Sequence, residues 1–285
     1  MPELPEVETI VRDLSPLVVG RRIARATLSH DDVLRGVTAR QLVRGLAGMT
    51  ITGVFRRAKH AVFDLAEQCG NRTDTTAGRR LVVQPGMTGS LLVYDRTPAA
   101  PERRYAVLQA VLDDGRLLVY RDVRRLGTLL FLDPAGWSRY DAAIGPEPLD
   151  PAFTARDLGR ALGGSRQAIK KVLMDQRHLA GVGNIYANEA LFAAGIDPSK
   201  PANRLTPDDH ARLHHHVRRI LSAAIASKGT TFRDYRTGTG ERGGFQMQLF
   251  VYGRAGEPCR VCGTRLASTH EIDGRATVFC YRCQR

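Results

Sequence analysis

Four cysteines near the C-terminus have the spacing of a metal site. Cys259 and Cys262 form one C-x-x-C pair, and Cys280 and Cys283 form a second pair after seventeen intervening residues. Each pair lets two thiolates reach one ion, and two pairs complete a closed tetrahedral shell, which is typical of structural Zn²⁺. Two disulfides or two redox dithiols are the alternatives, and neither suits a cytosolic chain without a thioredoxin-like unit. The spacing therefore predicts one structural zinc ion that holds a small β-hairpin together.

The N-terminal residues could supply a nucleophile. Initiator methionine is generally removed before a small residue such as proline, which would leave Pro2 with a free secondary amine. An α-amino group has a reference pKa of about 8, so a sizeable neutral fraction exists at pH 7. Such an amine can attack a sugar aldehyde carbon and form an iminium, which is an electron sink for elimination. Many chains begin with Met-Pro for no catalytic reason, so this feature alone is a weak indication.

The first part of the chain, 1–132, has the pattern of a β domain opened by one helix. Residues 3–19 carry apolar side chains at helical spacing, and Pro16 is expected to shorten or kink the end of this helix. Asp113-Asp114-Gly115 is a hairpin turn signal. Short β-type runs lie at 51–65, 81–83, 90–94, 105–112, 116–121 and 128–132. This pattern predicts an antiparallel sandwich or barrel.

The second part of the chain changes to helical periodicity. Residues 133–152 are rich in proline and glycine and are expected to form a linker. Over 153–247, Thr154 and Ser165 are expected N-caps, one helix is expected over 184–194, and a longer one from Thr206 to about Ser227. The cysteine pairs place a separate finger at 248–285.

Two features of this part have no regular pattern. The loop 229–246 is rich in Gly, Thr and Arg and is too long for a simple connection, so a functional role is expected. His214, His215 and His216 lack a defined ligand set and are expected on the solvated face of the long helix.

Composition limits the class of protein. The 285 residues have ordinary globular composition, no apolar run of 18 residues and an acidic N-terminus, so neither a membrane span nor a signal peptide is expected. The net charge is +13, of which residues 1–150 hold +3 (21 basic, 18 acidic) and residues 151–285 the remaining +10. A basic half indicates a polyanionic partner, although an Arg-rich genome could also produce it.

Several long segments of the chain form a recognisable set. They are PELPEVE at the start, RRAKH at 56–60, QPGMTGS at 84–90, DVRRLG at 122–127, IGPEPL at 144–149, the run at 170–198 and the two cysteine pairs with their surroundings. With these segments the chain resembles the bacterial formamidopyrimidine-DNA glycosylase family. The sister family, endonuclease VIII, shares the architecture but usually begins PEGPE, so Leu4 favours the formamidopyrimidine branch.

The resemblance implies an α+β fold of two domains. An N-terminal helix and an antiparallel β-sandwich form the catalytic domain, and a helical domain with a helix–two-turns–helix element and a zinc-bound β-hairpin follows. Pro2 is implied to attack C1′ of the damaged nucleotide, Glu3 to protonate the opening sugar, and Lys59 to act as general acid/base in the elimination steps. Otherwise, Glu3 would be a helix N-terminal acid and Lys59 a solvated edge charge. Lys59 is one of only five lysines.

Further residues are implied to open and hold DNA. Met87, Arg124 and Leu126 would fill the gap left by the everted base, with Arg124 paired to the orphaned partner base. The family usually has phenylalanine at Leu126 and often histidine at Tyr105, so an aliphatic wedge and an altered phosphate contact are expected. Core packing is the alternative for Met87 and Leu126.

The basic part of the chain is implied to bind phosphates. Arg166, Lys170 and Asn184 would do so from the helix–two-turns–helix element, with Arg166 and Lys170 at the start of a helix. Arg275 in the zinc hairpin would grip the phosphates that flank the lesion and assist the last elimination. The loop 229–246 would close over the everted base.

The implied activity is a bifunctional DNA glycosylase and abasic-site lyase of base-excision repair. It would remove 8-oxoguanine and formamidopyrimidines from double-stranded DNA and cut the strand by β,δ-elimination, as a bacterial cytoplasmic monomer that works on the nucleoid without a nucleotide cofactor. The alternatives are an endonuclease VIII-like glycosylase for oxidised pyrimidines and a non-catalytic zinc protein that binds DNA.

Overall fold

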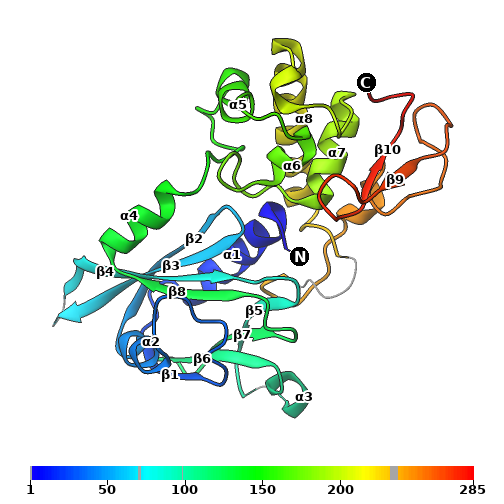
Figure 1. Ribbon diagram of the computed structural model, residues 1–285. Coiled ribbons are helices and arrows are strands. Elements are labelled where there is room, and N and C mark those ends of the chain that lie inside the picture. The colour runs from blue at the N-terminus through cyan, green and yellow to red at the C-terminus, as the bar shows by residue number, and fades with distance from the viewer. Residues whose placement is uncertain (1, 70–71, 98, 232–236) are drawn as a thin grey trace. The chain divides into compact units, whose positions relative to one another are not determined.

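Two four-stranded antiparallel sheets form the first part of the computed structural model, which describes residues 2–69, 72–97, 99–231 and 237–285 (Figure 1). Buried side chains of both sheets, among them Phe63 and Tyr120, share one hydrophobic core. The predicted antiparallel sandwich is therefore confirmed. One sheet has the order β1 (Ile23–Leu28), β6 (Ala106–Leu112), β7 (Leu117–Asp122), β5 (Gly89–Tyr94), and the other β2 (Thr50–Arg57), β3 (His60–Cys69), β4 (Arg72–Gln84), β8 (Thr128–Leu132).

The strand boundaries follow the predicted runs except at two places, since β4 begins at Arg72, well before the predicted run 81–83, and the run at 51–65 is divided. The hairpin between β6 and β7 turns at residues 113–115, as predicted, with Gly115 at φ +87°. The run at 51–65 is two strands, because the chain reverses at Ala58 and Lys59 and β2 pairs with β3 from Arg57 and His60 onward. Ala58 has φ +52°, a left-handed conformation that is uncommon for alanine.

The N-terminal helix α1 (Leu4–Val18) buries its apolar face in the sandwich core. Val7, Ile10 and Leu14 are fully buried, at the spacing that one helix face requires. Pro16 lies inside the helix, which continues to Val18, so the expected shortening is wrong. Two short helices, α2 (Ala39–Leu46) and α3 (Ala100–Arg103), complete this region.

A further helix, α4 (Pro134–Ala142), occupies the first half of the expected linker and packs on β4 and β8. The Arg80 guanidinium lies 4.5 Å from the Trp137 ring centroid, a cation–π contact that fastens α4 to the sheet. The compact units are Met1–Ala142 with Lys228–Gly244, and Ala143–Ser227 with Phe245–Arg285. The first unit therefore includes residues 228–244, which follow the helices in sequence. The predicted domain ranges, 1–132, 153–247 and 248–285, did not assign this segment to the first unit.

The second unit is built from helices and one short hairpin. Thr154 and Thr206 are N-caps, as expected, and Gly195 at φ +69° ends α7. Ser165 caps no helix, because its Oγ accepts from the Gln167 amide at 3.2 Å. The elements are α5 (Ala155–Leu162), α6 (Ile169–Met174), α7 (Asn184–Ala194), η1 (Ala202–Arg204), α8 (Pro207–Ala226), η2 (Phe245–Gln248), β9 (Ala267–Thr269) and β10 (Thr277–Phe279).

The described helices also answer the question of a membrane span. None of them has both the length and the hydropathy needed to cross a bilayer.

Candidate functional site

The N-terminus is built into the start of α1. Glu3 is the N-cap of the helix and is only 3% exposed, and Pro2, directly before it, is also buried. Partial positive charge concentrates at a helix N-terminus, which favours the neutral form of a nearby amine over the protonated form. Glu3 is thus a helix N-terminal acid by position, and it directly follows Pro2 in the chain. The two interpretations of Glu3 are compatible.

A second carboxylate, that of Glu6, holds this N-terminus in place. Its Oε2 accepts the Glu3 amide at 2.8 Å, and its Oε1 accepts the Thr230 amide at 2.7 Å. Gly229 has φ +79°, and a Cβ there would lie 2.9 Å from Glu6 Oε1, so the approach requires glycine. The start of α1 is therefore joined directly to the segment Lys228–Gly244.

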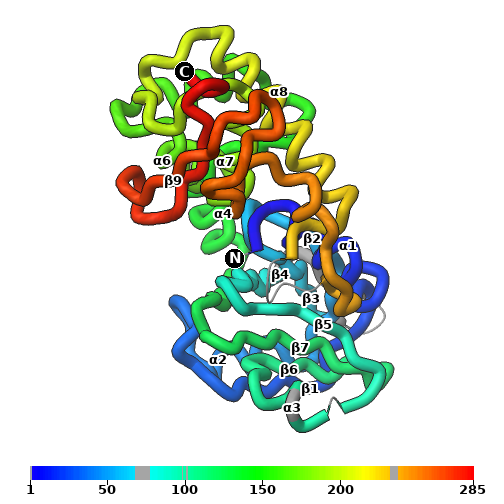
Figure 2. The backbone as a smooth tube through the Cα atoms, turned by 90° about the vertical axis from the view of Figure 1, so that its right-hand side faces the viewer, coloured from blue at the N-terminus to red at the C-terminus, as the bar shows by residue number. Residues whose placement is uncertain are grey.

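The same segment lies along α1 beyond this contact. A Cβ at Gly238 would lie 2.7 Å from the Asp13 side chain and 3.0 Å from the Ile10 carbonyl. Figure 2 shows the described residues 237–244, in orange, beside the blue helix α1. Of the expected capping loop 229–246, residues 232–236 lie outside the described residues. The described ends are fixed to the helix that carries Pro2.

Lys59 lies at the tight turn between β2 and β3 and is 5% exposed. This burial argues against a solvated edge charge. Arg56 connects the turn to α1, because its Nε donates to Glu8 at 2.9 Å and its Nη1 donates to the Ala58 carbonyl at 3.1 Å. The ammonium of Lys59 is therefore carried by a turn that is tied to the first part of the helix behind Pro2.

The proposed wedge residues lie on two adjoining turns, β4–β5 and β7–β8. Met87 is 44% exposed and Leu126 is 51% exposed, so core packing is excluded for both. Arg124 Nη1 lies 3.7 Å from the Met87 sulfur. A Cβ at Gly86 would lie 2.6 Å from the Gly127 nitrogen, which shows how closely the turns approach. The structure thus brings the three wedge residues into one exposed group.

Asp122 holds these two turns together through its buried side chain. Its carboxylate, 1% exposed, accepts the Thr88 hydroxyl at 2.5 Å and the Gly127 amide at 2.8 Å. It also accepts the Tyr120 hydroxyl at 3.1 Å, and burial with this neighbouring charge raises the pKa of Tyr120 strongly. Tyr105 is half-buried at the start of β6, where its carbonyl accepts the Asp122 amide.

The expected phosphate-binding residues of the second unit differ in their exposure and in their hydrogen-bond partners. Arg166 and Arg275 are exposed, Arg166 before α6 and Arg275 in the β9–β10 turn. Asn184 is the first residue of α7, as expected, and its Nδ2 donates to the Ala276 carbonyl at 3.1 Å. Arg166 does not begin a helix, because α6 starts at Ile169.

Lys170 is fully buried, so the expected contact with DNA does not fit its position. Its Nζ donates to the Thr277 hydroxyl at 2.7 Å and lies 3.4 Å from Asp273. Asn188 adds a bond from the same hairpin, since its Oδ1 accepts the Val278 amide at 2.8 Å. Lys170 therefore fastens the turn that carries Arg275 to the helices.

The four cysteines form one cluster, with all sulfur atoms within 4.8 Å of one another. The Sγ atoms of Cys259 and Cys283 are 4.0 Å apart, and those of Cys262 and Cys280 are 3.5 Å apart. Tetrahedral Zn–S bonds of about 2.3 Å require S···S distances of roughly 3.8 Å, so the cluster fits a four-thiolate metal site. Hydrogen bonds from Thr264 lower the pKa of Cys262 to about 6, whereas burial raises the pKa of Cys280 and of Cys283, so the case for a metal site rests on the geometry of the sulfur atoms.

The sequence analysis did not identify Glu6, Asp122 or Asn188 as functional. Glu6 could have been found, because it lies four residues before Ile10 on the buried face of the first helix, where an unpaired acid is not expected. Asp122 and Asn188 show no such signal, since their importance depends on partners far away in the chain.

Comparison with known proteins covers the whole chain. Residues 1–129 match the formamidopyrimidine-DNA glycosylase N-terminal domain, and residues 144–236 match the formamidopyrimidine-DNA glycosylase H2TH domain. The formamidopyrimidine-DNA glycosylase of Stutzerimonas stutzeri is 42% identical over 285 residues, which is 100% of both chains.

Solved structures agree with this match. A variant of the Lactococcus lactis FPG protein in complex with Fapy-dG DNA superposes with a TM-score of 0.87 at 34% identity, over 100% of both chains. A complex of MutM with DNA that contains carbocyclic 8-oxo-G gives a TM-score of 0.87 at 33% identity, again over 100% of both chains.

Proposed function

The chain belongs to the formamidopyrimidine-DNA glycosylase family, and we propose that it removes oxidised purines from duplex DNA and then cleaves the strand. The substrates are 8-oxoguanine and formamidopyrimidines, the lesions named for the DNA of two structural neighbours. One chain carries every group that the reaction needs. On this basis we propose a monomer that works on the bacterial nucleoid in the cytoplasm.

The reaction begins at Pro2 after Met1 has been removed. The neutral Pro2 nitrogen attacks C1′, the bond from C1′ to the damaged base breaks, and the departing base takes up the proton that the Pro2 nitrogen loses. Glu3 protonates O4′ as the sugar opens to the iminium. The iminium then draws electrons from C2′ when a base removes its proton, and the 3′ phosphate leaves. A second elimination expels the 5′ phosphate, and hydrolysis frees Pro2. Lys59, buried in the turn that Arg56 ties to α1, transfers protons in the elimination steps.

The exposed turns of the first unit open the duplex. Met87 and Leu126 enter the stack where the damaged base leaves, and Arg124 pairs with the orphaned base. The half-exposed state of Met87 and Leu126 supports this role. Because Leu126 is aliphatic, it prises the base step apart without stacking as an aromatic ring would. Tyr105 donates to a phosphate from the same unit.

The second unit binds phosphates through Arg166, Asn184 and Arg275. Lys170 contributes by holding the turn of Arg275 in place, and Arg275 also assists the last elimination. The metal at the four cysteines is zinc, with a purely structural role, because a closed four-thiolate shell leaves no position for substrate. The segment 229–246 covers the everted base.

The observation that carries the proposal is the buried Pro2 directly before the N-cap of α1, with Glu3 as that cap. Borohydride reduction of the enzyme with 8-oxoguanine duplex is expected to trap a covalent adduct. A chain with one alanine inserted before Pro2 turns the Pro2 nitrogen into an amide and should trap none, whereas Pro5→Ala should still trap. Mass spectrometry of the N-terminus must show that Met1 is absent.

Two outcomes would contradict the proposal. Trapping by the alanine-extended chain at the normal rate would refute Pro2 as nucleophile. Faster cleavage of thymine glycol duplex than of 8-oxoguanine duplex would assign the chain to the oxidised-pyrimidine branch.

A further inference from the structure

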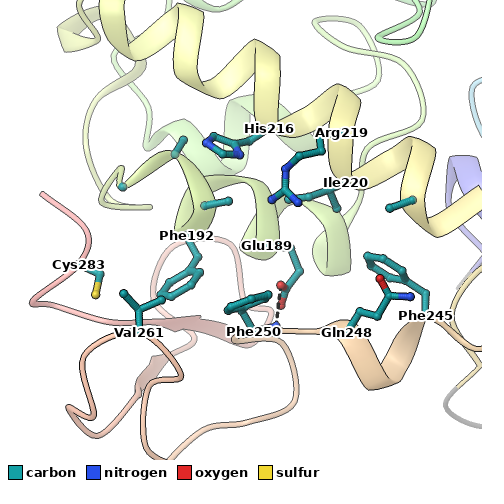
Figure 3. Close-up of a pocket in the computed structure, with 14 residues that line it drawn as sticks. Glu189, Phe192, His216, Arg219, Ile220, Phe245, Gln248, Phe250, Val261 and Cys283 are labelled. Carbon is teal, nitrogen blue, oxygen red and sulfur yellow. Dashed lines mark hydrogen bonds between the residues drawn. The ribbon is translucent and has the colours of Figure 1, made fainter.

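The second unit contains a cavity of about 480 Å³ that the proposed reaction does not use. It lies between α7, α8 and the segment that leads into the cysteine cluster (Figure 3). Residues from all three regions line it, and Cys283 of the metal site lies at one end. A cavity of about 150 Å³ is enough to hold a benzene ring, so this one can hold two fused rings and a polar substituent.

One side of the cavity presents aromatic surfaces. The rings of Phe192 and Phe250 are nearly parallel, with centroids 5.9 Å apart and an interplanar angle of 29°. Phe245 adds a third ring, and Val261 is 67% exposed at the rim. Phe250 itself is 40% exposed, which is unusual for a large apolar side chain that already stacks on a buried one. A planar ring bound here would cover this surface.

The opposite side is the face of α8 with His216, Arg219, Ile220 and Ala223, which follow one another at helical spacing. In Figure 3 the Arg219 guanidinium extends from α8 toward the aromatic side. Nδ1 of His216 is buried and has no hydrogen-bond partner among the described residues. The expectation of a solvated face therefore holds for the exposed His215 but not for His216, nor for His214, whose ring bonds inward to the Phe153 carbonyl at 2.8 Å.

Charge in the cavity is one-sided. Glu189 is the one carboxylate among the described lining residues, and it is already occupied, because it accepts the amides of Phe250, Val251 and Tyr252 at 2.8–2.9 Å. Outside the cavity, the Arg260 guanidinium lies 5.9 Å from the Phe250 ring centroid. Arg219 is thus the cationic side chain that lines the cavity and can attract an anion, and Arg260 adds positive charge outside it.

We propose that this cavity is a binding site for a small planar aromatic anion. The ring lies against Phe192, Phe250 and Phe245, and its carboxylate or equivalent anionic group faces Arg219 and His216. A bound ligand would contact α7, α8 and the chain around the four cysteines at the same time. The inference rests on the second unit alone and does not depend on the proposed glycosylase reaction.

Calorimetric titration of the metal-loaded full-length protein tests the site, with naphthalene-2-carboxylate as the probe and naphthalene-2-carboxamide as its neutral match. We expect one saturable site per chain and at least tenfold tighter binding of the carboxylate. Arg219→Gln should weaken carboxylate binding at least tenfold, since a charge-assisted bond is lost. Ala223→Phe should abolish binding of both probes by filling the cavity.

The matched control is Arg218→Gln, which removes the same charge from the neighbouring position of α8. Arg218 donates instead to the Pro148 and Asp150 carbonyls at 2.7–2.8 Å, and this change should alter binding by less than twofold. Equal affinity for the two probes, equal effects of the two arginine variants, or unchanged binding by Ala223→Phe would each overturn the proposal. Thermal unfolding must show that each variant remains folded.

Discussion

Replacement of Glu6 by glutamine tests whether one buried carboxylate sets the position of the N-terminus that carries the proposed nucleophile. Glu6 is 1% exposed and accepts two backbone amides, from Glu3 at 2.8 Å and from Thr230 at 2.7 Å. Glutamine offers one carbonyl oxygen and an NH₂ group, so the NH₂ must face one of these amide donors. One hydrogen bond is lost, one buried N–H is left without this acceptor, and the remaining bond loses its charge.

The expected cost follows from these two bonds. A hydrogen bond to a charged group contributes about 1.5–3 kcal/mol, a neutral one about 1 kcal/mol, and a stranded buried donor costs about 1–3 kcal/mol. Glu6→Gln should therefore lower the free energy of unfolding by about 2–4 kcal/mol. The rate of excision should also fall at least tenfold, because the Glu3 amide no longer fixes the chain beside Pro2.

Urea unfolding and single-turnover excision of 8-oxoguanine measure the two effects. Asp13→Asn is the matched control on the same helix, because Asp13 Oδ2 is only a distant acceptor, 3.5 Å from the Thr239 hydroxyl of the same segment. That change should cost less than about 0.5 kcal/mol. If Glu6→Gln unfolds and reacts like Asp13→Asn, the contact to Thr230 does not position the N-terminus.

Four further predictions concern other parts of the chain. Gly127→Ala should destabilise the wedge turns by about 1–3 kcal/mol and slow base eversion, because its Cβ would lie 1.9 Å from the Tyr120 hydroxyl. Thermal unfolding and the fluorescence of 2-aminopurine beside the lesion measure the two effects, and Gly164→Ala, whose Cβ meets open space, is the control. Cys280→Ser should lose the metal, seen by elemental analysis, and weaken DNA binding at least tenfold; full binding without metal would contradict the structural role. The logarithm of the affinity for duplex DNA should fall linearly with the logarithm of salt concentration with a slope of at least about −3, whereas a flat dependence would contradict the phosphate contacts. Hydrogen bonds from Arg177 lower the pKa of Asp175 to about 2 from 3.8. Asp175→Asn should therefore remove a stabilisation that is present above pH 3.8 and is lost as the pH falls through 2, as urea titrations would show. This stabilisation should be less than about 1 kcal/mol because the pair is partly solvated.

Local sequence patterns predicted the elements whose signals are local. The antiparallel sandwich, the turn at 113–115 and the caps at Thr154 and Thr206 follow from alternation and capping chemistry, and these are confirmed, although the run at 51–65 proved to be two strands. The turn at Ala58 and Lys59 carries no glycine, proline or asparagine, and pairing of the two strands alone forces it. Helix α4 was not predicted, because proline and glycine in its sequence favour a linker. Its contact with the sheet is made by Trp137, which stacks on Arg80.

The candidate site shows the same division. The four cysteines could be predicted as one cluster, because two pairs suffice to define a metal shell. The burial of Lys170 could not be predicted, since its partners Asp273 and Thr277 lie more than 100 residues away. The resemblance implied which residues contact DNA. It did not indicate that a residue such as Lys170 would be buried and would hold another part of the site in place.

The bond between Glu6 and Thr230 has a consequence for the biosynthesis of the protein. It joins residues 224 positions apart, so it forms only after nearly the whole chain has left the ribosome. Until then the first unit lacks its segment Lys228–Gly244. Once the segment has docked, the Glu6 carboxylate accepts the amides of both Glu3 and Thr230. The start of α1 therefore gains its full set of contacts only late in synthesis.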